Sequence, residues 1–243
     1  MNRWDNLERW LPAAHYPHPR RFAMTISEIR ELLNHPDSTQ RQKGILALKD
    51  YDANIAIPLL LSKQNDPEFL VRSFVAMGLG RKRSEAAFAA LLTMIETDSD
   101  TNVQAEATNS LSMYGEAAVP VLVRTFDQNG NWLVRRSILA AMLDLDAPVE
   151  LLEICLKATQ DDDMTVVQAG IDVLSTLTGT EQAAAALDAI LAFAEDDNWR
   201  TRMQVAYALK RFDQDAARQA LIKLRQDEHH RVVAAALEGL LPS

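Results

Sequence analysis

The residues of this sequence that could ligate a metal or take part in catalysis are scattered along it. Cys155, the single cysteine, lies in an apolar stretch between Leu151 and Leu156. A thiolate there could ligate a metal or a cluster, but no basic residue precedes it to lower the pKa of the thiol. We therefore expect a small, buried, hydrophobic side chain, as free cysteines often are.

Histidine pairs and acidic runs could also suggest metal sites. Pro17 lies between His15 and His18 and Pro19 follows them, and no further Cys or His cluster joins this pair or His229-His230. The runs Asp98-Ser99-Asp100 and Asp161-Asp162-Asp163 resemble the start of a calcium loop, but they lack its glycine at position six and its glutamate at position twelve. We expect helix-capping acids, and no metal or cofactor bound by this chain alone.

Motifs of catalysis and nucleotide binding are missing as well. Gly78-Leu79-Gly80 lacks a third glycine, and the sequence contains no Gly-x-Ser-x-Gly, His-Glu-x-x-His or Cys-x-x-Cys. These absences favour a protein without an active site of its own.

Composition narrows the class of protein further. The 243 residues are 48% hydrophobic and 24% charged, which indicates a folded globular chain. The formal net charge of −9 disfavours nucleic acid and anionic membranes as partners. One cysteine forms no internal disulfide, no secretory leader is recognisable, and no apolar run approaches the roughly 20 residues of a membrane helix. We expect a cytoplasmic protein.

A repeat positions these residues. Each copy closes with an aliphatic side chain, and these recur every 31 to 35 residues, at Leu48, Leu79, Leu111, Met142, Leu174, Leu209 and Leu240. Counting that residue as column nine, columns one, five and eight also carry small or aliphatic residues, a helical spacing. In most copies an Asp stands five residues before column one, where its carboxylate can cap the helix.

An apolar stretch before each Asp predicts a first helix in each repeat. These stretches are 55–61, 86–95, 118–126, 149–156, 183–193 and 216–224. Pro58 and Pro120 are expected in the opening turns of their helices. Since one helix pair cannot bury its apolar face, the pairs must stack. The prediction is an all-α superhelix, a solenoid of about seven helical hairpins over residues 25–243.

Residues 1–24 differ in kind and form an N-terminal arm or cap. Trp4, Leu7, Trp10 and Leu11 fall on one side of a short predicted helix, and three prolines follow. The segment either covers the first repeat or presents its tryptophans to a partner.

The repeated string Asp-x-x-x-x-Val-Arg-x-x-Ala-x-x-Ala-Leu, with Phe69, Trp132 or Trp199 two residues before the Val position, resembles the short HEAT-like repeat of the phycobilisome lyase family. The resemblance covers about residues 25–242. That family includes bilin lyase subunits of the E and F type, phycobilisome-degradation factors, and a cyanobacterial partner of an A-type iron–sulfur carrier. Column two departs from the pattern at Gln104, Val167 and Val233, which replace the Arg. The Arg of this column is therefore not a functional residue shared by all repeats.

Columns three, seven and ten should face away from the first helices and line the concave surface. Column three holds Gln42, Ser73, Ala105, Arg136, Gln168, Met203 and Ala234, and column seven holds Leu46, Met77, Asn109, Ala140, Asp172, Tyr207 and Glu238. Mixed apolar and charged side chains suit a protein-binding groove. The predicted partner-binding residues are Met77, Asn109, Arg136, Asp172, Met203 and Tyr207.

Two other groups have a structural explanation. The aromatic positions, with Met164 and His230 in the same column, recur with the repeat, so we expect them to pack over the inter-repeat turns rather than to hold a ligand. The basic run Arg81-Lys82-Arg83 follows a predicted helix and is expected to be a solvated helix end.

Two classes of function stay open. The favoured one is a non-enzymatic scaffold that binds another protein on its concave face and assists delivery of a cofactor. The resemblance implies a phycobiliprotein with its bilin, or an iron–sulfur carrier, as that partner. The alternative is an enzyme, a bilin lyase subunit, or else a phycobilisome-associated chaperone. A HEAT-type DNA glycosylase is disfavoured because the concave columns lack a basic stripe.

Overall fold

The computed structural model describes residues 24–238, which form fourteen α-helices and, over that range, no strand. The helices pair into seven hairpins. The first helices are α1 (Ile26–Leu33), α3 (Ala53–Leu61), α5 (Glu85–Thr97), α7 (Val119–Gln128), α9 (Pro148–Ala158), α11 (Ala183–Leu191) and α13 (Asp215–Leu224). The second helices are α2 (Ser38–Ala47), α4 (Phe69–Lys82), α6 (Thr101–Ser112), α8 (Trp132–Met142), α10 (Met164–Leu174), α12 (Trp199–Leu209) and α14 (His230–Leu237). The predicted all-α solenoid is confirmed.

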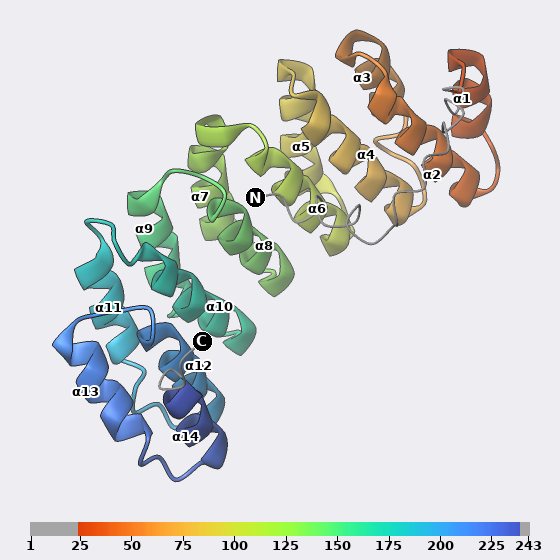
Figure 1. The fold of residues 1–243 in the computed structure, drawn as a ribbon. Helices are drawn as coiled ribbons and strands as arrows, with labels where there is room; N and C mark the ends of the chain where they lie inside the picture. The colour runs from red at the N-terminus through yellow and green to blue at the C-terminus, as the bar shows by residue number, and fades with distance from the viewer. Residues whose placement is uncertain (1–23, 239–243) are drawn as a thin grey trace, which may run out of the picture.

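The hairpins stack into an arc. Figure 1 shows the even-numbered second helices on its inner side and most first helices on its outer side. Neighbouring second helices such as α4 and α6 contact each other extensively, whereas neighbouring first helices such as α3 and α5 touch only sparsely. Since the inner helices pack more closely than the outer ones, the stack curves and the second helices line its concave face.

One hydrophobic core runs through all the described repeats. Columns one, five and nine of α4 are Val71, Val75 and Leu79, and each has 0% of its surface exposed. Small residues set the distance between helices. A Cβ on Gly80 would lie 2.8 Å from the Cβ and the carbonyl oxygen of Ser110 on α6, so only glycine permits this approach. Gly80 and the buried Ser175 both stand in column ten, so the expectation that column ten lines the concave surface is wrong at these positions. In column five, a Cβ on Gly170 would lie 2.9 Å from the Cβ of Ala158 on α9, so small residues there also let neighbouring helices approach closely.

The structure corrects some local predictions. The predicted helix from Ala118 begins with a 3-10 turn, Gly115–Ala118, and α7 starts at Val119. Pro120 is in the opening turn of α7, as predicted. Pro58 is not in an opening turn: it is the sixth residue of α3, so the carbonyl of Asn54 loses its helical N–H donor. The arm predicted over residues 1–24 and the closing Leu240 lie outside the described residues, apart from Met24.

Candidate functional site

A row of side-chain pairs joins neighbouring repeats and explains column two. Arg72 on α4 donates from Nε and Nη2 to the carboxylate of Asp98 at 2.7 and 2.8 Å. Its Nη1 donates to the backbone carbonyl oxygens of Asp66 and Pro67 at 2.8 and 3.3 Å. Equivalent pairs, which together we call the ladder, are Arg41–Asp66, Arg135–Asp161 and Arg202–Asp227. The recurring Arg of column two thus pairs one repeat with the next.

The exceptions in column two obey the same geometry. Asn129 stands where other repeats have Asp, and its Nδ2 donates to Oε1 of Gln104 at 3.1 Å, so a neutral amide pair replaces the ion pair. Val167 is buried and offers no donor, and Asp196 in the following turn forms no ion pair with any described residue. The ladder therefore has a gap between α10 and α12.

The repeated Asp does not cap its helix directly. Oδ1 of Asp98 accepts from the backbone N–H of Asp100 at 2.9 Å, and Asp100 in turn caps α6 by accepting from Asn102 N–H at 2.8 Å. The predicted N-cap was therefore wrong by two residues: the repeated Asp closes the turn and pairs with Arg. The acidic runs are structural, as expected from the sequence.

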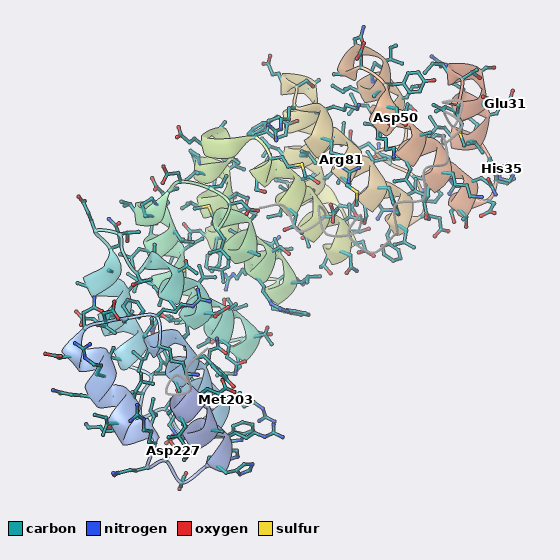
Figure 2. All side chains as sticks on the ribbon, viewed as in Figure 1. Glu31, His35, Asp50, Arg81, Met203 and Asp227 are labelled. Carbon is teal, nitrogen blue, oxygen red and sulfur yellow. The ribbon has the colours of Figure 1, made fainter. Side chains whose placement is uncertain are left out.

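The predicted partner-binding residues lie on the second helices that line the concave face. Asn109, Arg136, Asp172 and Tyr207 are exposed, and Met77 is half-buried. Met203 is half-buried and also packs against the core, so it is not purely a surface residue. Figure 2 shows Met203 on the inner side of the C-terminal repeats.

Arg136 and Asp172 share one groove. It has a volume of about 420 Å³ between α8 and α10, with Gln204 of α12 at its end. Neither Arg136 nor Asp172 forms an ion pair with a residue between Met24 and Glu238. The groove thus presents one cation and one anion that the described part of the fold does not use.

A second feature of the concave face was missed in the sequence. Trp199, Met203 and Tyr207 are four residues apart on α12, so they form one stripe along it. Phe69, Trp132 and Met164 occupy the position of Trp199 on their own helices and are 36%, 42% and 40% exposed. The expectation that these three pack over the turns is wrong. These residues stand four positions before column three, so they continue the line of columns three and seven by one helical turn. The sequence already contains this four-residue spacing.

The prediction that this aromatic column packs over the inter-repeat turns is confirmed for Trp199. Its ring stacks on His229 of the next turn, with centroids 4.0 Å apart and planes 4° apart. Burial, together with the neighbouring His230 and Arg231, lowers the pKa of His229. The neutral ring suits its role, since Nδ1 of His229 accepts from Arg231 N–H at 3.3 Å as the cap of α14. His229-His230 is therefore an aromatic stack and a helix cap.

The remaining candidates belong to the fold. Cys155 is fully buried, and burial strongly raises the pKa of its thiol, which fits the predicted packing role. Among residues 24–238 no group of three or more His, Cys, Asp or Glu side chains could hold a metal ion, and no helix is long and apolar enough to cross a membrane. Arg81 and Lys82 form the last turn of α4, and Lys82 Nζ donates to the carbonyl of Lys49 at 2.9 Å.

A cavity of about 710 Å³ lies between the first helices α11 and α13 rather than on the concave face. Its polar lining includes the ladder pair Arg202–Asp227 and also Asp196, which forms no ion pair within residues 24–238. Arg202 and the backbone N–H of His229 hold the pKa of Asp227 below its usual value, although burial opposes this. We interpret the cavity as the space between sparsely packed outer helices.

Comparison with protein families now bears on this architecture. A family model described as HEAT repeats matches residues 57–143 and 182–241, more than half of the chain. The chain belongs to the HEAT-repeat family. A sequence comparison with curated proteins found no match.

Solved structures agree with this HEAT-repeat assignment. YibA of Escherichia coli has a TM-score of 0.57 at 14% identity, covering 90% of this chain and 93% of that one. The complex of CpcE and CpcF of phycocyanin lyase from Nostoc sp. PCC7120 has a TM-score of 0.51 at 17% identity, covering 95% and 92%. At such identities the similarity shows the fold alone. HEAT-repeat solenoids of this kind are scaffolds suited to binding other proteins.

Proposed function

We propose that this HEAT-repeat protein is a non-enzymatic scaffold that binds another protein on its concave face. The observation that carries the proposal is that some polar residues stabilise the fold whereas others on the concave face do not. The ladder and the helix caps account for the column-two arginines and the turn acids, whereas Arg136 and Asp172 in the shared groove have no partner among the described residues. Exposed Tyr207 adds an aromatic anchor of the kind that dominates interface energies.

The titratable groups support a binding role over an enzymatic one. In the described range, the pKa values displaced from their usual range belong mainly to ladder members such as Asp98, to helix caps such as Asp163, and to the buried Cys155. An active site would gather several such groups in one cavity.

The test separates binding from folding. The protein is used as bait in an extract of its own cells, and the captured partner is then purified. The double variant Arg136→Ala with Tyr207→Ala should change stability by about 0.5 kcal/mol per site or less, because both side chains are exposed. It should weaken partner binding by about 2 kcal/mol or more, since aromatic and Arg anchors carry most interface energy.

Leu209→Ala serves as the opposite control. Leu209 has 0% of its surface exposed, so the cavity should cost about 2–5 kcal/mol of stability. Its affinity for the partner, measured at a temperature where the variant is still folded, should stay close to that of the wild type. Normal partner binding by the Arg136/Tyr207 variant would show that the concave-face assignment is wrong.

In the finer form of this proposal, the protein assists delivery of an iron–sulfur cluster or a bilin, and the partner holds that cargo. The burial of Cys155 supports the assignment of cargo ligands to the partner. Anaerobic reconstitution should give no stable cluster spectrum from the protein alone. The bilin lyase alternative is tested by co-expression with bilin synthesis and a phycobiliprotein, where a covalently coloured product that depends on this chain would favour the lyase.

A further inference from the structure

Two cations, one on α12 and one on the neighbouring α14, meet at the first residue of α12, and the described fold leaves both without an ion pair. The guanidinium carbons of Arg200 and Arg231 lie 4.6 and 5.5 Å from the centroid of the Trp199 ring. Neither side chain forms an ion pair with a residue between Met24 and Glu238. In a chain with a formal net charge of −9, two free guanidiniums over one aromatic ring are a local exception to the overall charge.

The other end of the same stripe is electrically balanced. Lys210 Nζ lies 4.7 Å from the centroid of the Tyr207 ring, but it is also 3.3 Å from a carboxylate oxygen of Glu238. From Trp199 to Tyr207 the stripe extends about 12 Å along α12. It therefore has a cationic end and an apolar, neutral end.

We infer that the docking segment of the partner carries carboxylates that meet Arg200 and Arg231 beside Trp199, followed by apolar side chains that cover Met203 and Tyr207. The inference rests on the proposed protein-binding function and specifies the chemistry of the partner. Carboxylates pair well with guanidiniums, and partial desolvation over an aromatic ring strengthens the attraction. A polyanion such as nucleic acid would be repelled by the acidic remainder of the protein and would leave the apolar end uncovered.

The experiment uses the full chain and a defined probe. The probe is a fluorescein-labelled helical peptide in which three glutamates precede three leucines at helical spacing, and its twin has glutamine in place of each glutamate. We expect the wild type to bind the glutamate probe about tenfold more tightly than the twin at low salt. The preference should shrink as ionic strength rises, because the pairs are near the surface.

Variants assign that preference to residues. The double variant Arg200→Gln with Arg231→Gln should bind both peptides equally. Arg218→Gln is the matched control, because Arg218 is exposed on α13 and pairs locally with Asp215 at 2.9 Å, and it should keep the preference. Tyr207→Ala should weaken both peptides by the same factor. Melting temperatures of all variants check that they are folded.

Three results would overturn the inference: equal affinity of the wild type for both peptides, a preference that survives in the Arg200/Arg231 variant, or competition by oligothymidine as effective as by the glutamate peptide. None of these touches the proposed function, which fails separately if the purified partner binds the Arg136/Tyr207 variant normally.

Discussion

At the scale of single residues, the ladder shows how a solenoid can bury charge. The side chains of Arg72 and Asp98 are only 12% and 7% exposed, which is tolerable because the guanidinium satisfies two carboxylate oxygens and two backbone carbonyls at once. The sequence offered a signal for these pairs. Gln104 and Asn129 depart from Arg and Asp together, 25 residues apart, as expected if the two positions are in contact.

That amide pair suggests a direct test of the ladder. Arg72→Ala should cost about 3–5 kcal/mol of unfolding free energy, because it leaves the carboxylate of Asp98 buried without its partner. Combining Arg72→Gln with Asp98→Asn copies the Gln104–Asn129 pair and should restore most of the loss. Urea unfolding of the two proteins measures the difference. A double variant no more stable than Arg72→Ala would mean that the ladder geometry contributes little.

At the scale of elements, existence and type were predictable and the fine boundaries were not. The second helices were predictable because small and aliphatic residues recur in the core columns at a helical spacing, which differs from the alternating pattern of a strand. The position of Pro58 was missed because α3 starts at Ala53, two residues before the run of large apolar side chains from Ile55 on which the prediction rested. The exposure of Trp132 was missed because a recurring aromatic suggests packing, whereas only tertiary structure shows which neighbours it lacks.

The gap in the ladder makes one junction between elements distinct. At Val167 and Asp196 the rung is missing, and this repeat is also the longest, with 35 residues from Leu174 to Leu209. We expect native-state hydrogen exchange to show the α10–α12 junction opening at lower free energy than the α4–α6 junction, where Arg72 bridges the repeats.

Two substitutions test whether the missing rung causes this opening. Arg135→Val removes the bridge to Asp161 and should bring the α8–α10 junction to a similarly fast exchange. Val167→Arg, which supplies a guanidinium to Asp196, should slow exchange at α10–α12 if it is accommodated as the other column-two arginines are. Unchanged exchange at α8–α10 in Arg135→Val would remove the ladder from the explanation.

At the scale of the whole molecule, the fold follows almost entirely from the repeat, whereas the binding surface follows only in part. Any solenoid of this period has an inner row of second helices, so the concave location of Asn109 and Asp172 could be predicted. The cationic surroundings of Trp199 could not, because His229 and Arg231 come from the next repeat and meet the ring only after stacking. Contacts between repeats are the part of the site that a single repeat does not encode.

Because the ladder crosses most repeat junctions, acid should destabilise the whole stack. The guanidinium of Arg202 and the backbone N–H of His229 lower the pKa of Asp227 from its usual 3.8, and Arg72 with the N–H of Asp100 does so for Asp98 although burial opposes it. A carboxylate whose pKa is lower in the folded state stabilises that state above its unfolded pKa, and this contribution is lost as the pH falls through the folded value. The melting temperature should therefore fall steeply below about pH 4.

Falling pH also reduces the repulsion within a chain of net charge −9, which acts in the opposite direction. The comparison that isolates the ladder is between the wild type and the double variant Arg72→Gln with Asp98→Asn, which has one titrating rung fewer. The difference in melting temperature between the two proteins should be constant from pH 7 down to about pH 4 and should narrow from there to pH 3, because the unfolded wild type binds a proton at Asp98 that the folded protein binds less readily. Parallel curves over that range would show that Asp98 contributes nothing to the pH dependence of stability, and that acid acts on the stack through groups other than this rung.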